Sequence, residues 1–593
     1  MDKASGVYLT IKDSSFFAGG YSNLKCFIPM LTTKGKIGLN YVTAANVDEV
    51  VGYNDKYNPL YIGLKRILEK LNYAYVLRIN QNAKLANAYW NNSSVTSQAN
   101  VTGDIESLTT KTFAVACKTP GNPVDQLGQK LVARFDFQTT NVAAENKKGE
   151  IYTITVPSVN TSLTYSLGAT SGLIKGVRVY DASGNLVGVC KNVSGTFNLY
   201  TYDSSNGTIG TDIIGTYSGT TVTINANKEF STDSSWIIKC IPSTATELVA
   251  EFGVTSNSDA QFNNVSITET YSFSLDSTSD DYWESVDFGS FAFTTTATSI
   301  TSSNAAMMNA FGSWKELANG DNGSTINSIN VNELPLSELD GSECNICAMN
   351  GITEVPVINR IANKCITNKI HVFVDAPAYG KYTDIASWKA SLIHSEYVAV
   401  CARPDQTTDS TLKTVYIYPS VNYVAIYADM LSSFGYLNYP PAGFTYGNIT
   451  VDNLIDCDFE MFKDEMKTNR INWQRVTNNG TCIWEQRTTY SLDTDLSYIA
   501  PVFIVQELGQ QIVEFEQNFN FRYMTRSDLL TQQSGLTAIL NNFVSNGFIY
   551  SYELDVPDYD TAQKSGRTLK IKVKVQVMKD SEVIELELEL TNG

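Results

Sequence analysis

Two cysteines are the first residues whose types and spacing could do chemistry. Cys344 and Cys347, in the stretch SECNIC, have the two-residue gap of many metal and redox sites. Such a site needs a second cysteine pair or nearby histidines, and the whole chain has two histidines, His371 and His394. His371 lies in an apolar strand pattern and His394 lies near a predicted helix end. Buried, inert thiols are therefore favoured over a metal or redox role.

Asp375 is the next candidate, because it closes the apolar stretch KIHVFVDAP. Enzymes of the α/β class often place a catalytic acid at the carboxyl end of a strand. No nucleophile or ligand cluster accompanies it, so loop capping is the favoured role. The stretch LANGDNG, residues 317–323, lacks the spacing of phosphate-binding loops and is expected to be a turn. Arg487, in CIWEQRTTY, is expected in a structural or interface ion pair. We therefore predict no enzymatic activity, no metal and no cofactor.

The most regular stretches of the chain offer another chemistry, the hydrogen bonding of an exposed strand. Near the C-terminus lysine alternates with aliphatic residues, and glutamate then alternates with leucine. The stretch GVYLTIK, residues 6–12, alternates in the same way, which is typical of a strand with one buried face. Alternating side chains set the register of such a strand in a sheet. The residues concerned are Val7, Tyr8, Leu9 and Ile11, then Lys570, Ile571, Lys572, Val573, Lys574 and Val575, and finally Glu585, Leu586, Glu587, Leu588, Glu589 and Leu590.

Two interpretations of the C-terminal ribbons stay open. The simpler one is a hairpin within one chain that turns at KDS, residues 579–581. In the other, the lysine ribbon receives the glutamate ribbon of a neighbouring subunit. In both, opposite charges on adjacent strands stabilise their pairing, while like charges discourage pairing of like with like.

These stretches lie in a chain whose hydrophobic pattern changes twice. Residues 24–80 follow an α/β pattern, in which NPLYIGLKRILEKL forms one apolar helical stripe. From about residue 100 to 305 the chain is rich in Ser, Thr, Asn and Gly, and turn signals separate short strands. The α/β pattern then resumes, with continuous apolar strands that predict a sheet covered on both faces. Two helices follow, one entered through Pro501 and one with Ser527 as its predicted N-cap.

Length and composition narrow the function classes. A chain of 593 residues implies roughly two to four domains. The net charge of −18 argues against a nucleic-acid-binding surface, which needs clustered Lys and Arg. No run of about 18 apolar residues occurs, so no membrane-spanning helix is expected. The start of the sequence lacks the apolar core of a signal peptide, so folding in a cytoplasm is expected.

The order of the motifs resembles that of the tail sheath proteins of contractile-tailed bacteriophages. SGVYLTIKD resembles the family's N-terminal strand, LANGDNGS its glycine-rich turn, and VFVDAP a strand of its α/β domain. YPSVNYVAIYADMLSSFGYLNYPPAG is similar to the family's helix entry. INWQRVTNNGTCIWEQRTTY is similar to a strand and turn of the family, but Glu485 replaces a glycine and a glutamine is added before Arg487. The resemblance covers roughly residues 1–100 and 310–593.

The resemblance implies a structural subunit that polymerises as stacked rings around a tail tube and contracts to drive the tube through the host envelope. The expected fold is a multidomain mixture of α+β and α/β, with an inserted antiparallel β-rich domain and extended strand arms. Its parts are an N-terminal strand arm (1–20), an α/β middle domain (21–100 and 306–458), the inserted surface domain (101–305), a C-terminal α+β core domain (459–580) and a C-terminal strand arm (581–593).

The resemblance also implies partners and a location. In that family the arms add strands to the sheets of neighbouring subunits, so the resemblance favours pairing of the glutamate ribbon with a neighbouring subunit. The first expected partner is therefore a second copy of the chain. The tail tube protein, the baseplate and the tail terminator are also expected, whereas nucleic acid and direct membrane insertion are not. The expected location is the virion, in a tail assembled in the host cytoplasm. The alternatives are the sheath of a non-viral contractile injection system and a β-rich surface-binding or adhesin-like protein.

Overall fold

The chain divides into two compact units. Unit 1 comprises residues 1–83 and 322–593, and unit 2 comprises residues 84–321. The computed structural model describes residues 24–52, 60–90, 112–124, 128–137, 247–275, 281–298, 311–409, 412–451, 453–565 and 567–580, together with residues 277 and 300 and eight strands between residues 150 and 242. The arms predicted at 1–20 and 581–593 lie outside the described residues.

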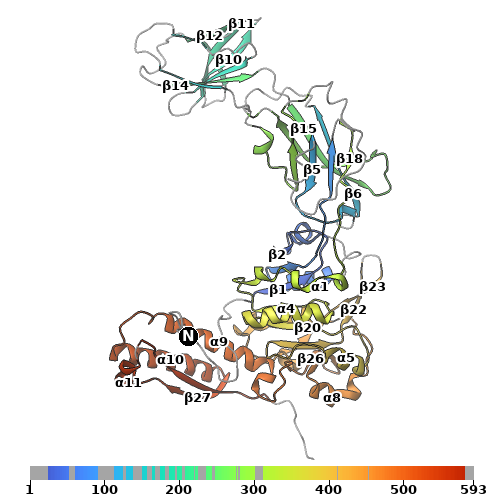
Figure 1. The fold of residues 1–593 in the computed structure, drawn as a ribbon, viewed down its shortest axis with the longest axis vertical. Coiled ribbons are helices and arrows are strands. Elements are labelled where there is room, and N and C mark those ends of the chain that lie inside the picture. The colour runs from blue at the N-terminus through green and yellow to red at the C-terminus, as the bar shows by residue number, and fades with distance from the viewer. Residues whose placement is uncertain are drawn as a thin grey trace, which may run out of the picture. The chain divides into compact units, whose positions relative to one another are not determined.

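Unit 1 is built on a nine-stranded sheet with helices on both faces (Figure 1). In sheet order the strands are β2 (Gly38–Val42), β3 (Ala74–Arg78), β1 (Cys26–Met30), β19 (Ile346–Ala348), β20 (His371–Asp375), β21 (Val398–Ala402), β25 (Ile471–Thr477), β26 (Gly480–Trp484) and β24 (Asn448–Ile449). The strands from β3 to β25 are parallel, in agreement with the continuous apolar strands of the sequence.

Two sets of helices cover this sheet. Helices α1 (Leu60–Lys70) and α6 (Pro419–Phe434) contribute to the core on one face. Helices α4 (Val355–Asn368), α5 (Tyr382–Lys389) and α8 (Lys463–Thr468) contribute to the core on the other face. The remaining elements include the two-stranded sheet of β22 (Asp405–Thr408) and β23 (Thr414–Ile417) and the short helix α7 (Gly443–Tyr446).

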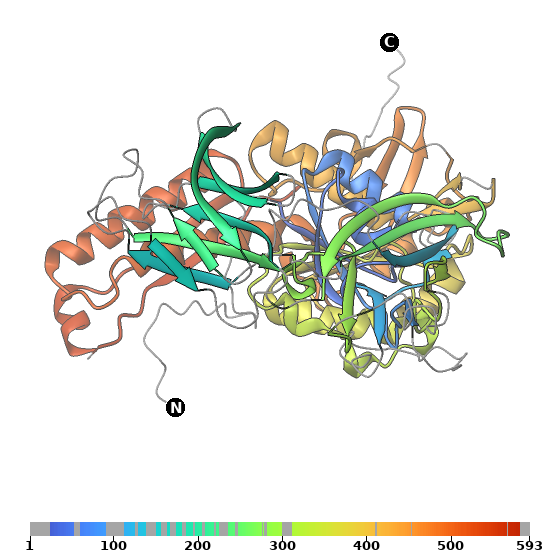
Figure 2. The same cartoon turned by 90° about the horizontal axis from the view of Figure 1, so that it is seen from above.

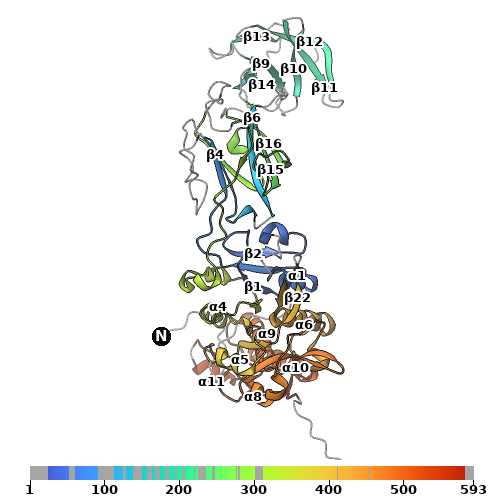
Figure 3. The same cartoon turned by 90° about the vertical axis from the view of Figure 1, so that its right-hand side faces the viewer.

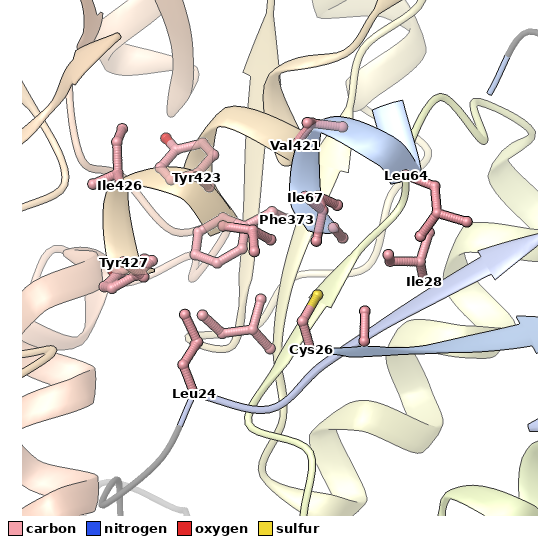
Figure 4. Packing of buried hydrophobic residues seen from close by; sticks show 14 of the residues in the cluster. Leu24, Cys26, Ile28, Leu64, Ile67, Phe373, Val421, Tyr423, Ile426 and Tyr427 are labelled. Carbon is pink, nitrogen blue, oxygen red and sulfur yellow. The ribbon is translucent and has the colours of Figure 1, made fainter. Parts of the chain in front are cut away.

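The core beside α1 and α6 forms because the apolar stripes of both helices meet the inward side chains of the sheet (Figure 4). Leu64 and Ile67 of α1 are fully buried, as the helical periodicity predicted. Phe373 of β20 stacks on Tyr423 of α6, with ring centroids 4.2 Å apart. Helix α6 has Pro419 in its first turn, where no intrahelical N–H is needed, and is followed by Gly435 in a left-handed conformation.

The C-terminal part of unit 1 is a helical hairpin packed on a two-stranded sheet. The hairpin consists of α9 (Ile499–Gln517) and α10 (Arg526–Ser545), and the sheet of β27 (Ile549–Asp555) and β28 (Lys572–Val577), with α11 (Tyr559–Lys564) in the connection between the strands. The predicted N-cap Ser527 is wrong. Thr525 caps α10 instead, because its hydroxyl accepts from the backbone N–H of Asp528 and also bonds the Asp528 carboxylate.

Unit 2 contains two nested sets of antiparallel strands, in agreement with the predicted β-rich insertion. The first consists of a three-stranded and a four-stranded sheet, some of whose strands are labelled in Figure 3. These two sheets share an aromatic core. The strands are β17 (Phe291–Thr295), β5 (Phe113–Cys117) and β4 (Asn87–Trp90), and then β16 (Ser266–Ser274), β15 (Glu247–Ser256), β6 (Gln129–Phe137) and β18 (Lys315–Glu316). Phe113, Phe135 and Phe293 lie at its centre, with ring centroids 5.2 to 5.6 Å apart.

The second set is an eight-stranded sheet, seen from above in Figure 2. Its order is β7 (Glu150–Thr155), β14 (Ser235–Pro242), β9 (Ile174–Tyr180), β10 (Leu186–Val193), β11 (Thr196–Asp203), β12 (Thr208–Ser218), β13 (Thr221–Ile224) and β8 (Leu163–Ser166). This sheet interrupts the chain between β6 and β15, where Phe137 and Leu248 are paired.

The bounds of the domains differ from the prediction. The inserted unit begins at Lys84 and ends at Asp321, rather than at residues 101 and 305, because β4 and β18 already belong to its sheets. The boundary predicted between residues 458 and 459 divides one sheet, since β25 and β26 are strands of the nine-stranded sheet. Where unit 2 begins and ends, the N–H of Lys84 donates to the carbonyl of Asp321 over 2.9 Å.

Candidate assembly interface

Asp375 has the capping role that the sequence predicted. Its carboxylate is fully buried and accepts from the backbone N–H of Gly351 (2.8 Å), the backbone N–H of Ser420 (2.7 Å) and the Ser420 hydroxyl (2.6 Å). Burial raises the pKa of Asp375 to about 6, and these donors act against that rise. Ser420 lies in the first turn of α6, so the carboxylate joins β20 to a helix N-terminus.

The two histidines and the CxxC pair also make structural contacts. Nε2 of His371 lies 2.8 Å from Oε1 of Gln506, and burial lowers the pKa of His371 to about 3. His394 bonds the carbonyl of Thr489 through Nδ1 at 3.0 Å. Cys344 and Cys347 are both buried, and burial raises the pKa of the Cys344 thiol to about 11. Within the described part of the chain, no group of three or more His, Cys, Asp or Glu could hold a metal ion, and no helix is long and apolar enough to cross a membrane.

The turn after β26 contains Glu485 and Gln486, where the sequence differs from the family pattern that it resembles. Glu485, which replaces a glycine, has a left-handed backbone with φ of 69°. Arg487 lies 3.8 Å from Glu485 and stacks on Tyr498, the structural pairing that the sequence predicted. The added Gln486 donates through Nε2 to Oδ2 of Asp580 over 2.7 Å. This contact attaches the last described residue to unit 1, and sequence reasoning missed it because no local pattern links residues 94 positions apart.

Strands β27 and β28 form an antiparallel hairpin with two different faces. On the inner face, Tyr552 and Leu554 of β27 and Val573 and Val575 of β28 are partly buried against α9 and α10. The outer face carries cross-strand polar pairs. These pairs are Ser551 with Gln576, Glu553 with Lys574, and Asp555 with Lys572.

The charges of the outer face are arranged in rows, acidic on β27 and basic on β28. Nζ of Lys574 lies 2.7 Å from Oε2 of Glu553, and Nζ of Lys572 lies 3.8 Å from Oδ2 of Asp555. The hydrogen bond from Lys574 lowers the pKa of Glu553 and raises that of Lys574. All four side chains are more than 70% exposed, so each pair contributes little to stability. Strand β28 begins at Lys572, so the predicted start at Lys570 and Ile571 is two residues early.

Each strand of the hairpin has an outer edge. Among the described residues, β27 and β28 pair with each other alone, so one long side of each strand has no neighbouring strand. In an antiparallel pair, about half of the backbone N–H and C=O groups of a strand point to its other side. The predicted arm residues Val7, Tyr8, Leu9, Ile11 and Glu585 to Leu590 lie outside the described residues, so their pairing stays a prediction.

A buried carboxylate lies between the helices that support this hairpin. Glu516 of α9 is 8% exposed, and its Oε2 accepts from Nε2 of Gln532 of α10 over 2.9 Å. Its Oε1 has no hydrogen-bond partner among the described residues. Burial therefore raises the pKa of Glu516 to about 7, because the charged form is poorly compensated.

We expect Glu516→Gln to remove a pH dependence of stability. A carboxyl whose pKa is raised on folding stabilises the fold below its unfolded pKa, and this contribution is lost as pH rises through about 7. As the pH rises from 5 to 8, the free energy of unfolding of the variant should thus increase relative to that of wild type, as measured by urea unfolding. Glu514→Gln, at an exposed position of the same helix, is the matched control. A constant difference for Glu516→Gln would contradict the prediction.

No protein-family model and no curated protein matches the chain. Solved structures do match. The sheath tail protein of Listeria innocua has a TM-score of 0.45 at 10% identity, over 91% of this chain and 89% of that one. That of Desulfitobacterium hafniense has a TM-score of 0.43 at 10% identity, over 93% of each chain. The helical sheath of the anti-feeding prophage in the contracted state has a TM-score of 0.36 at 18% identity, over 43% and 74%. Each of these three solved structures is a sheath tail protein or the sheath of a prophage-type contractile system.

Proposed function

We propose that the chain is the sheath subunit of a contractile phage tail. It polymerises as stacked rings around a tail tube, and the sheath contracts to drive the tube through the host envelope. The order of the sequence motifs supports this proposal. The observation that carries it is the β27–β28 hairpin, whose two outer edges and charged rows suit the addition of strands from other subunits.

The charged rows favour a different arm at each edge. The C-terminal ribbon has glutamates at 585, 587 and 589, which match the basic row of Lys572 and Lys574 on β28. The same ribbon beside β27 would face Glu553 and Asp555, and like charges on adjacent strands are destabilising. The N-terminal stretch 6–12 has no acidic residue and ends at a lysine, so it suits the acidic edge of β27.

Main-chain hydrogen bonds and apolar side chains supply most of the affinity in this arrangement, and the charges supply selection. Each opposite-charge pair across adjacent strands contributes about 0.2–1 kcal/mol. The free energy of strand addition differs between the correct edge and the wrong edge by more than the attractive pairs contribute, because pairing at the wrong edge also adds repulsion. Since each subunit both gives and receives strands, the contact is head-to-tail and does not close on itself, which generates a helical polymer.

Charge inversion tests this pairing. We expect Glu585→Lys, Glu587→Lys and Glu589→Lys together to raise the concentration needed for polymerisation on the order of tenfold, because attraction to Lys572 and Lys574 becomes repulsion. Negative-stain microscopy and sedimentation of the purified chain measure the effect.

A second variant serves as the compensating control. It adds the inversion of the whole hairpin row, with Glu553→Lys, Asp555→Lys, Lys572→Glu and Lys574→Glu, which keeps the pairs within the hairpin opposite in charge. We expect it to recover polymers at concentrations closer to wild type. Tubes that form equally well in all three chains would contradict the charge-based pairing, and a wild-type chain that stays monomeric at every salt concentration would contradict the sheath proposal.

The partners of the proposed subunit are further copies of itself, the tail tube protein, the baseplate and the tail terminator. The proposal includes no enzymatic activity, no cofactor, no nucleic acid and no direct insertion into a membrane. It places the subunit in the virion, after assembly in the host cytoplasm. A sheath of a non-viral injection system would use the same edges, and the particles that contain the chain distinguish the two. DNA-filled heads attached to the tails support the phage tail, and tails without genomes support the injection system.

A further inference from the structure

The connection between α9 and α10 presents two aromatic side chains to solvent. Phe521 is 90% exposed and Tyr523 is 92% exposed, the largest exposed fractions of any large hydrophobic side chain among the described residues. We call residues 518–525 the aromatic loop. Aromatic anchors of this kind are typical of the energetic centres of protein interfaces, since they bury a large area with little loss of side-chain entropy.

The aromatic loop is held by specific contacts. The carbonyl of Met524 accepts from Nε2 of Gln563 over 2.8 Å, and Arg522 forms an ion pair of 3.2 Å with Asp528. The N–H of Arg522 donates to the carbonyl of Phe519 at 3.2 Å. Phe521 itself has a left-handed backbone with φ of 62°, which is unfavourable for a bulky residue. The loop therefore has an unfavourable backbone conformation and exposes an apolar ring to water. This combination is typical of a surface that contacts another molecule.

The loop lies at one end of the β27–β28 hairpin. Gln563, which bonds Met524, belongs to α11, and α11 is part of the connection from the end of β27 to the start of β28. The guanidinium of Arg526, at the first position of α10, lies 5.1 Å from the ring centroid of Tyr559 in α11. Figure 1 shows α11 beside α10. The aromatic loop is therefore connected through α11 to the segment that leads into β28.

The terminal segment, residues 581–593, is longer than β28. Strand β28 has six residues, and the alternating ribbon 585–590 has the same number. When these two stretches pair, the terminal segment extends beyond β28 by residues 581–584 at one end and 591–593 at the other. At about 3.3 Å per extended residue, each extension reaches roughly 10–13 Å past the strand. Whichever direction the added strand takes, one extension passes the start of β28, on the side of the connection that contains α11, which the aromatic loop contacts.

We propose that the aromatic loop is a second contact for residues 581–593 of another copy of this chain, beyond the edge of β28. The inference rests on the proposed strand addition. The chemistry of the two partners matches, because the segment is acidic and apolar, with four glutamates, while the loop and the start of α10 offer Phe521, Tyr523, Arg522 and Arg526. The loop thereby extends an interface that the six residues of β28 define only in part.

The chain offers a matched control for testing this contact. Leu412 is also apolar, is 83% exposed and also has a left-handed backbone, with φ of 63°. Phe521→Gly and Leu412→Gly should therefore relieve similar backbone strain and change the melting temperature of the monomer in the same direction. We expect only Phe521→Gly, combined with Tyr523→Ser, to raise the polymerisation concentration, on the order of tenfold.

Photo-crosslinking identifies the occupant of the loop. A benzophenone amino acid at position 523 of the full chain, irradiated in assembled polymers, should join this position to a peptide within residues 581–593 of another copy. Crosslinks to any other peptide, or polymers of the Phe521 and Tyr523 variant that form as readily as wild type, would overturn the inference. A wild-type chain that never polymerises would instead contradict the proposed function, so the two failures are distinguishable.

Discussion

Deletion of residues 582–593 is expected to abolish polymer formation while leaving a folded monomer. The last described contact to the body of unit 1 is made by Asp580, and the apolar core under β28 uses residues up to Val577. The deletion thus removes a strand that the proposal assigns to a neighbour, without removing core side chains. Negative-stain microscopy should show no tubes, and the melting curve by circular dichroism should stay close to that of wild type.

A pattern-preserving variant provides the control for this deletion. Leu586→Val, Leu588→Val and Leu590→Val together keep the alternation and the charges, and valine is a good strand former. This variant should still form tubes. Normal tubes from the deleted chain would contradict the hypothesis that residues 581–593 form an arm that pairs with a neighbouring subunit. An unfolded deletion product would show that the terminal segment belongs to the core of its own subunit.

The largest loss of stability is expected from Phe373→Ala. Phe373 is 1% exposed, stacks on Tyr423 and lies 5.8 Å from Tyr427 between ring centroids, in the centre of the core beneath α6. Truncation of such a ring removes its buried area and leaves a cavity that the fixed sheet cannot fill. We expect a decrease of about 3–5 kcal/mol in the free energy of unfolding, measured by urea titration followed through tryptophan fluorescence.

Phe434→Ala is the comparison for that loss. Phe434 lies at the C-terminal end of α6 and is 46% exposed, so its truncation leaves no closed cavity. We expect a decrease of roughly 1 kcal/mol, within the common range for a partly exposed site. A decrease below about 1 kcal/mol for Phe373→Ala would show that the core beneath α6 repacks, contrary to close packing.

The sequence predicted the elements whose periodicity directly reflects burial. Helix α1 has one apolar stripe because one face meets the sheet, and Leu64 and Ile67 of that stripe are fully buried. Strand β20 is buried along its whole length, with an apolar centre of Val372, Phe373 and Val374, because helices cover both faces of its sheet. The capping role of Asp375 followed from its place after an apolar strand and from the lack of a catalytic partner.

Features that depend on distant pairing were not predictable from local patterns. The alternation of lysine and aliphatic residues is the same at Lys570 as at Lys572, so it does not show where pairing begins. The start of β28 is set by its partner, because Lys572 pairs with Asp555 at the end of β27. The membership of β25 in the nine-stranded sheet depends on its pairing with β21, about 70 residues earlier in the chain.

Both insertions of unit 2 begin and end at residues that are paired with each other. The insertion enters and leaves through neighbouring backbone positions, since Lys84 bonds Asp321, and the N–H of Ser324 donates to the carbonyl of Gln81 over 2.8 Å. The eight-stranded sheet repeats the arrangement one level deeper, between the paired residues Phe137 and Leu248. The first and last residues of each insertion are thus neighbours in space. Another domain whose termini lie equally close could take its place without moving the flanking strands. Replacement of either insertion by such a domain is therefore expected to leave the strand order of the nine-stranded sheet unchanged.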